Sequence, residues 1–122
     1  MSTAFTPILK GTIEHTPGAL AAIFADAEGE AVDQVSQGRL KQDDLLVLGA
    51  HYGVVLALMR AGLKRLTLGP PEEVLIHHDR LDVLIRDAGD GYYVVLAMQS
   101  GSHLATAQRG LQSCVKRLKA EM

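Results

Sequence analysis

A run of fifteen residues without a formal charge, from Leu45 to Met59, is the feature that most constrains how this chain can fold. If the run is helical, a turn of about 100° per residue places apolar side chains around its whole circumference. A surface helix of a small domain normally has one apolar and one polar face, whereas here charged residues return only at Arg60 and Lys64. The chain's own sheet can cover one side of such a helix. We therefore expect the other side to lie against a second chain.

Three strips run along this predicted helix. Gly49, Gly53 and Ala57 form a strip of small residues, which favours close approach to a sheet or to another helix. This strip separates two apolar sides. The first side consists of Leu45, Leu48, Tyr52, Leu56, Met59 and Leu63. The second side consists of Val47, His51, Val54 and Leu58. The sequence alone leaves open which of the two sides meets a second chain.

The composition is that of one soluble domain covering residues 1–122. The net charge is −2 and no basic stripe is present, so a nucleic-acid partner is not expected. Cys114 is the single cysteine, which excludes an internal disulfide and fits the reducing cytoplasm. The first residues, MSTAFTPILKG, do not read as a signal peptide. We expect a cytoplasmic protein.

The apolar run is also too short for a membrane-spanning helix. A bilayer requires about 20 apolar residues, whereas this run has fifteen, among them two glycines and a histidine. We therefore expect a buried helix and no membrane insertion.

The periodicity of apolar residues predicts the element order α-β-β-α-β-β-β-α. The first helix contains Phe5 to Ile13 and ends at Thr16-Pro17-Gly18. The central helix is capped by Asp43 or Asp44 and ends before Gly69-Pro70-Pro71, and Ser102 caps the last helix. The predicted strands span residues 19–25, 30–36, 74–79, 81–87 and 92–99.

Strands 19–25 and 92–99 are apolar on both alternating faces, so helices must cover both sides of one sheet. Turn residues between successive strands predict hairpins. Joining the two doubly apolar strands gives a five-stranded, mostly antiparallel sheet of the α/β (α+β) class with strand order 2-1-5-4-3. Strands 30–36 and 74–79 are then its edges.

At this point the chain resembles the Roadblock / dynein light chain family over nearly its whole length. The resemblance depends on the element order, on Asp26 and Gly29 in a D-x-x-G turn, and on the long apolar helix with its glycines. It also depends on the turn at Asp90-Gly91, the apolar strand after it, and the helix after Ser100-Gly101-Ser102. It implies a profilin-like three-layer α-β-α sandwich. It further implies a homodimer in which the central helix and the following strand pair across a two-fold axis and the two sheets join.

The resemblance also implies a class of partner. Members of this family serve as platforms for Ras-like small GTPases, and some bacterial members stimulate GTP hydrolysis without supplying a catalytic side chain. We therefore expect a non-enzymatic, homodimeric regulator or scaffold that binds a small Ras-like GTPase. The alternative is a profilin-like sensory or small-molecule-binding domain, although the chain offers few convergent polar groups for a pocket.

The expected dimer interface combines the second side of the helix with the edge strand 74–79. An exposed apolar edge strand promotes aggregation unless another strand pairs with it, and a symmetric dimer would cover both features at once. The predicted interface residues are Val47, His51, Val54, Val55, Leu58, Val74, Leu75, Ile76, His77 and His78.

No catalytic, cofactor-binding or metal site is predicted. His77 and His78 are adjacent in a strand and point to opposite faces, so one metal ion cannot readily take both. His51 has no nucleophile or orienting carboxylate at an obvious spacing. Cys114 falls on the apolar stripe of the last helix, where an inert core thiol is expected.

Overall fold

A computed structural model describes residues 3–37, 41–69 and 71–122, so Pro70, one of the expected helix-ending residues, lies outside the described part. The element order matches the one predicted from the sequence. The elements are α1 (Thr6–His15), β1 (Ala19–Ala25), β2 (Ala31–Ser36), α2 (Gln42–Leu63), the short 3-10 helix η1 (Lys64–Leu66), β3 (Glu73–His77), β4 (Leu81–Gly89), β5 (Tyr92–Gln99) and α3 (Leu104–Glu121).

The five strands form one antiparallel sheet in the order β2-β1-β5-β4-β3, as predicted. β1 and β5 lie at its centre, where six of the seven residues of β1 and six of the eight residues of β5 are buried. β2 and β3 lie at the edges and are only half-buried. The doubly apolar pattern therefore identified the central strands, because such a strand needs cover on both faces.

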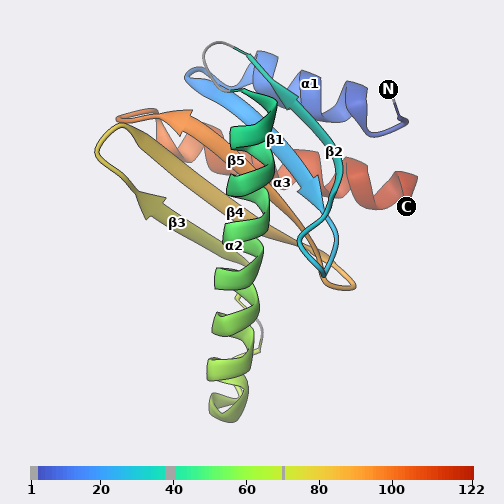
Figure 1. The fold of residues 1–122 in the computed structure, drawn as a ribbon, viewed down its shortest axis with the longest axis vertical. Coiled ribbons are helices and arrows are strands. Elements are labelled where there is room, and N and C mark those ends of the chain that lie inside the picture. Colours follow the sequence, from blue (N-terminus) through green and yellow to red (C-terminus); the bar gives the residue numbers. More distant parts are fainter. Residues whose placement is uncertain (1–2, 38–40, 70) are drawn as a thin grey trace.

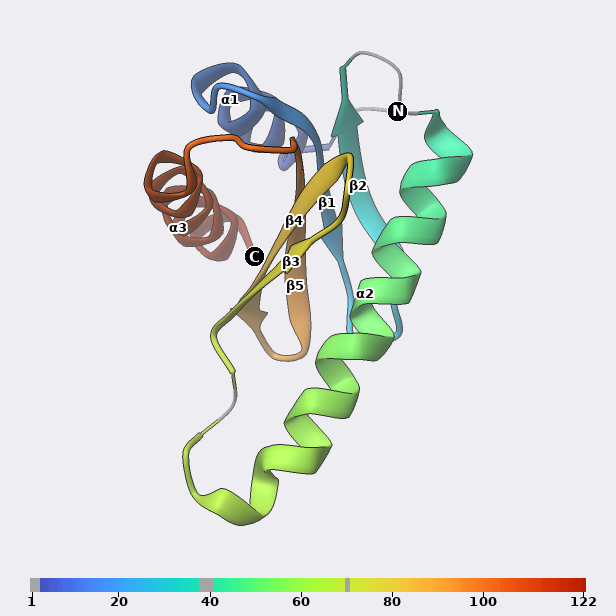
Figure 2. The same ribbon diagram turned by 90° about the vertical axis from the view of Figure 1, so that its left-hand side faces the viewer.

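The sheet is the middle of three layers (Figure 2). α1 and α3 cover one face, and α2 alone lies on the other. Adjacent residues of β1 point to opposite faces of the sheet. Phe24 belongs to the core between the sheet and the helices α1 and α3, whereas Ile23 belongs to the core between the sheet and α2. The predicted three-layer α-β-α sandwich is confirmed.

The β4–β5 hairpin shows why its turn has the sequence Asp90-Gly91. Both residues have positive φ, 54° and 84°, as a two-residue type I′ turn requires. Gly91 also lies against Ala27, because a Cβ at position 91 would be 2.6 Å from the Cβ of Ala27. A glycine is therefore needed here for both conformation and space.

Two helix starts differ from the prediction. α2 begins after Lys41 without a side-chain capping hydrogen bond, and Asp43 and Asp44 lie inside its first turn, where their charge suits the helix dipole. α3 is capped by His103, whose side chain accepts a hydrogen bond from the backbone N–H of Thr106. Ser102 was wrong as the cap, because its hydroxyl instead donates to the carbonyl of Gln99 at 2.6 Å.

Candidate protein-interaction surface

The first apolar side of α2 is the one that meets the sheet. Leu45, Tyr52 and Leu56 are buried, and all three belong to the core on this face of the sheet. The strip of small residues allows this contact to be close, since a Cβ at Gly53 would lie 2.0 Å from the hydroxyl oxygen of Tyr93 on β5. The second side of the helix is therefore turned away from the sheet.

That second side is exposed in the single chain. Val47, Val54 and Leu58 are 68%, 59% and 68% exposed, and His51 is exposed between them. We call these four residues the α2 stripe. Their spacings of four, three and four residues are those of the apolar seam between two packed helices. A single chain leaves this seam in water.

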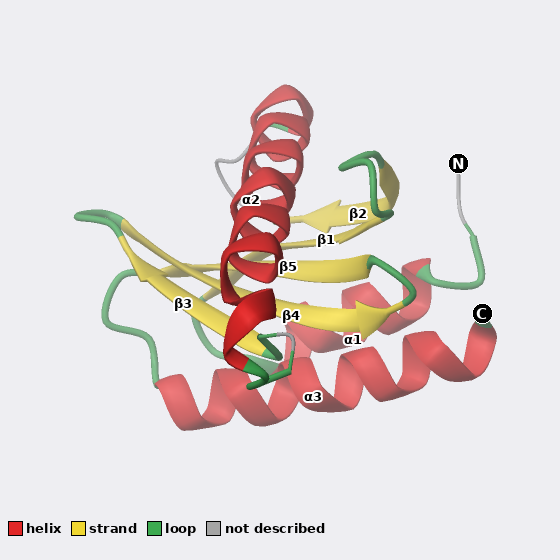
Figure 3. Cartoon of the chain, turned by 90° about the horizontal axis from the view of Figure 1, so that it is seen from below, coloured by secondary structure: helices red, strands yellow, loops and turns green. Residues whose placement is uncertain are grey.

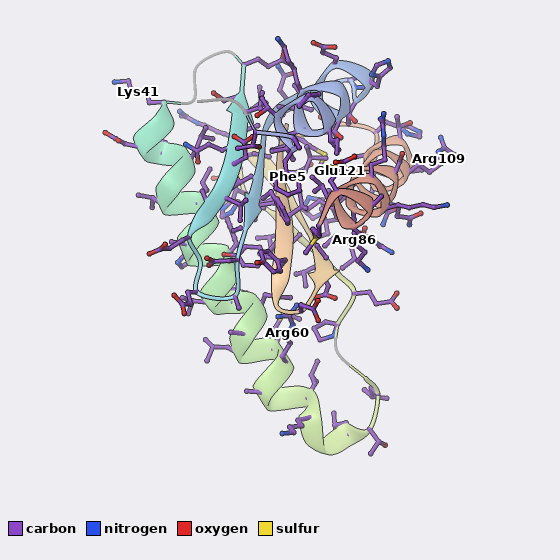
Figure 4. The ribbon with its side chains drawn as sticks, turned by 90° about the vertical axis from the view of Figure 1, so that its right-hand side faces the viewer. Phe5, Lys41, Arg60, Arg86, Arg109 and Glu121 are labelled. Carbon is purple, nitrogen blue, oxygen red and sulfur yellow. The ribbon has the colours of Figure 1, made fainter. Side chains whose placement is uncertain are left out.

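The C-terminal turns of α2 extend beyond the sheet (Figure 1). Figure 4 shows side chains around these turns projecting into open space. Leu66 and Leu68, in and after η1, add exposed apolar surface to this overhang. A hollow of about 320 Å³ lies beside it, lined by residues that include Arg60 and Thr67. Arg60 itself forms an ion pair with Asp87 of β4, which ties the start of the overhang to the sheet.

Sequence periodicity did not place Leu66 and Leu68 on this surface. The length of the predicted helix relative to the strands could have indicated that its end extends past the sheet. The 22 residues of α2 rise about 33 Å, whereas a seven-residue strand such as β1 spans about 23 Å. A helix this much longer than the strands beneath it can project past the layer.

β3 forms the second part of the surface. Among the described strands it pairs only with β4, and α2 lies mainly over β1, β2 and β5. Val74 and Ile76 are half-buried on the α2 face of the sheet, and Val55 of α2 packs against the same core. Leu75 packs on the opposite face, toward α1 and α3. Of the predicted interface residues in β3, only Val74 and Ile76 therefore lie on the face of the sheet that α2 covers.

The adjacent histidines at the end of β3 have different partners, as expected for residues that point to opposite faces. His77 Nδ1 lies 2.8 Å from the carboxylate of Asp82, and this hydrogen bond lowers the pKa of Asp82. His78 forms a hydrogen bond with the hydroxyl of Tyr52, whose pKa is raised by burial. The ring of His51 also lies against Tyr52, with centroids 5.3 Å apart. Tyr52 thus links the α2 stripe to the end of β3.

The exposed part of this surface consists mainly of apolar side chains. Across residues 3–37, 41–69 and 71–122, no group of three or more His, Cys, Asp or Glu residues could hold a metal ion. Cys114 is buried on α3, and this burial raises the pKa of its thiol. The polar side-chain atoms of the α2 stripe are confined to the ring of His51.

The helix continues beyond the fifteen-residue run that the sequence analysis judged too short, and the whole segment Asp43–Leu63 is long and apolar enough, by length and composition alone, to cross a membrane. In this fold, however, Leu45, Tyr52 and Leu56 are packed under the helix against the sheet. Insertion would require these contacts to be broken.

Comparisons with known proteins identify the fold. Neither a protein-family model nor a curated protein matches the sequence. A Roadblock/LC7 domain from Streptomyces avermitilis has a TM-score of 0.84 and is 16% identical over 93% of each chain. The gliding protein MglB from Thermus thermophilus has a TM-score of 0.86 and is 19% identical over 98% of this chain and 92% of its own.

An MglB structure with a tetrameric arrangement has a TM-score of 0.87 and is 19% identical over 98% of this chain and 91% of its own. At these identities the likeness concerns the fold. The chain has the Roadblock/LC7 fold, which confirms the resemblance seen in the sequence.

Proposed function

We propose that this protein is a non-enzymatic homodimer that regulates or scaffolds a Ras-like small GTPase. The observation that carries the proposal is the α2 stripe, an apolar helix face that a single chain leaves exposed. The GTPase as partner comes from the Roadblock resemblance. The MglB structure described with a tetrameric arrangement adds that a chain of this fold can assemble with other chains.

In the proposed dimer, α2 packs against the α2 of a second copy across a two-fold axis. Burying an apolar side chain of this size contributes about 1.5–3 kcal/mol, so the exposed parts of Val47, Val54 and Leu58 would contribute roughly 1–2 kcal/mol each. Two copies give roughly 6–12 kcal/mol, close to the estimated cost of association of about 4–15 kcal/mol. Burial of the stripe alone therefore only about balances the cost of association. We include the free edge of β3 in the interface because strand pairing across it would add to the free energy of association.

The first test is the mass of the protein in solution. Light scattering at micromolar concentration should give twice the mass of the chain or a multiple of it. A stable monomer at that concentration would contradict the dimer and remove the reason for the exposed stripe.

The second test concerns the partner. The full chain, immobilised and incubated with extract of its source cell plus GDP or a non-hydrolysable GTP analogue, should retain a small GTPase in one nucleotide state. The purified GTPase should then bind the chain, and its hydrolysis rate with and without the chain separates stimulation from tethering. Recovery of no GTPase in either nucleotide state would refute the GTPase part of the proposal and leave the dimer standing.

A further inference from the structure

The outward side of α3 carries a group of cations. Four of the chain's twelve lysine and arginine residues lie on this helix, Arg109, Lys116, Arg117 and Lys119, and its single acid is Glu121 at the C-terminal end. The four cations are exposed, and none of them makes an ion pair within the described part of the chain. We call these four residues the α3 basic face. The sequence analysis expected no basic stripe, because the net charge of −2 conceals how the fold separates the charges.

The α3 basic face covers the full exposed width of the helix. Arg109 and Lys116 are two turns apart, so they lie on the same side of α3, opposite its buried residues. Arg117 borders the groove toward α1. Lys119 lies on the other flank, beside the β4–β5 hairpin, where its Nζ is 3.8 Å from the Cβ position of Gly89. The cations are therefore spread over a surface and do not converge on one small ligand.

This surface belongs to the layer that faces away from α2. Figure 3 shows α1 and α3 together beneath the sheet, and the two helices contact each other. α1 adds Lys10 and Glu14 to the layer. The two helices thus hold five of the twelve basic residues and two of the fourteen acidic ones, which leaves seven basic and twelve acidic residues for the rest of the chain. The molecule has a basic layer on an otherwise acidic body.

The residues between the cations indicate what kind of partner this layer fits. The exposed large apolar side chains on and next to α3 are Leu104 and Met122, which stand at its two ends, and α3 contains no aromatic residue. A protein partner is normally held by buried aromatic and apolar anchors, and single-stranded nucleic acid by aromatic side chains that stack on its bases. Clustered lysine and arginine without such anchors is the pattern that attracts proteins to anionic lipid headgroups.

We propose that the α3 basic face binds the surface of an anionic lipid membrane without inserting into it. Each cation held near such a surface strengthens binding about fivefold. The four cations of one chain therefore give weak binding, and two chains that present their basic layers to the same membrane bind far more tightly.

The proposed dimer has the geometry that this requires, and the strength of membrane binding rests on that proposed function. Two β3 edges that pair antiparallel are related by a two-fold axis perpendicular to the sheet. Such an axis keeps both copies of α2 on one face of the joined sheet and both α1/α3 layers on the other. Eight cations of the α3 basic faces would then meet one membrane, while the α2 side remains free for the GTPase.

Co-sedimentation of the full chain with lipid vesicles tests the proposal. The chain should bind vesicles in which about a third of the phosphatidylcholine is replaced by phosphatidylglycerol, and it should not bind vesicles of phosphatidylcholine alone. Raising the ionic strength from about 0.1 M to 1 M should release it, because the screening length falls from about 10 Å to 3 Å. Equal binding to both kinds of vesicle, binding that survives the salt, or tighter binding to duplex DNA or polyglutamate than to the anionic vesicles would each overturn the assignment.

Two pairs of substitutions separate this face from net charge. Arg109→Gln with Lys116→Gln should lower the partition coefficient onto anionic vesicles at least about twentyfold, the product of two fivefold losses. The matched control is Lys41→Gln with Arg80→Gln, two exposed cations outside the α1/α3 layer; Figure 4 shows Lys41 and Arg109 on opposite sides of the molecule. The control should lower the coefficient less than about threefold. Equal losses in the two double variants would refute the site, and circular dichroism checks that both remain folded.

The mass of the protein in solution distinguishes failure of this proposal from failure of the dimer. A dimer that does not bind anionic vesicles would refute the membrane proposal alone. A monomer that binds them weakly, and loses that binding in the Arg109→Gln, Lys116→Gln variant, would refute the dimer and retain the membrane face. Val54→Asp, which should dissociate the dimer from the opposite side of the molecule, should weaken vesicle binding at least about twentyfold while leaving the α3 basic face intact.

Discussion

The hydroxyl group of Tyr93, on the central strand β5, donates a 2.8 Å hydrogen bond to the main-chain carbonyl oxygen of Gly49 in α2. One turn further along the helix, the Cα of Gly53 faces the same hydroxyl with no room for a Cβ. The contact sets the distance between α2 and the sheet, and it determines which side of the helix remains exposed. Burial raises the pKa of Tyr93, as expected for a phenol enclosed beneath a helix.

Gly53→Ala should destabilise the protein. Its methyl group would lie 2.0 Å from the Tyr93 hydroxyl, and forcing an extra carbon into a packed core costs about 1–3 kcal/mol. The free energy of unfolding in urea, at fixed protein concentration, measures the effect. Gly11→Ala is the matched control: this helical glycine has open space around its Cβ position, so alanine should stabilise the chain by about 0.5–1 kcal/mol. The same sign for both variants would contradict this account.

Tyr93→Phe should cost about 1 kcal/mol by removing the hydrogen bond to Gly49. Because the phenylalanine ring lacks the hydroxyl that a methyl group at position 53 would strike, combining it with Gly53→Ala should cost less than the sum of the two single variants. A double-mutant cycle on the free energy of unfolding measures this coupling. Strict additivity would mean that Tyr93 does not set the helix position.

Val54→Asp and Leu58→Asp should dissociate the proposed dimer without unfolding the chain, because both side chains are exposed in the single chain. A carboxylate without a partner in an apolar interface costs about 2 kcal/mol or more. A two-fold dimer contains two of them, so its dissociation constant should rise at least about a thousandfold. Sedimentation equilibrium gives the constant, and circular dichroism checks the fold.

Leu104→Asp is the control for these variants. Leu104 is also an exposed apolar residue, but it lies on α3, on the opposite face of the sheet. Its substitution should leave the association constant within about twofold of wild type. If Val54→Asp unfolds the chain, or if Leu104→Asp dissociates it equally well, the α2 stripe is not the subunit boundary.

The sheet could be predicted from the sequence because its signals are local. Strands β1 and β5 are apolar on both faces, and the Asp90-Gly91 turn specifies its hairpin, so the strand order followed from pairing neighbours. The helix caps were harder. Ser102 and His103 both stand before α3, and only the structure shows that the hydroxyl of Ser102 is already used by Gln99.

The interaction surface could be predicted in part. Periodicity separated Leu45, Tyr52 and Leu56 from the α2 stripe, but a helix that is apolar all round does not reveal which side meets its own sheet. The side that meets the sheet is determined by the close contact between Gly53 and the ring of Tyr93, which is evident only in the fold. The link between Tyr52 and His78 was also missed, because it joins residues 26 positions apart that come together only in the fold.

The pair of His77 and Asp82 should make stability depend on pH in the acid range. The hydrogen bond from His77 lowers the pKa of Asp82 in the folded chain, so the carboxylate adds stability above the unfolded value of about 3.9. This contribution is lost as the pH falls through that value toward the folded pKa. In urea unfolding, the difference between wild type and Asp82→Asn should therefore be largest above pH 5 and shrink toward pH 3. A difference between the two proteins that stays constant from about pH 7 to pH 3 would contradict this account.

Acid should also weaken the proposed dimer through His51. The imidazole lies in the middle of the α2 stripe, against Tyr52, whose hydroxyl forms a hydrogen bond with His78. A neutral histidine can be buried against a second chain, whereas a protonated one would be a charge without a carboxylate partner. Between pH 7.5 and 5 the dissociation constant should rise at least about tenfold, the factor that corresponds to 1.4 kcal/mol. Sedimentation equilibrium at both pH values measures the dissociation constant.

Two variants serve as controls. His51→Gln should remove most of the acid-induced rise in the dissociation constant, and His78→Gln should remove a smaller part of that rise. A dissociation constant that stays the same across this pH range would place His51 outside the interface.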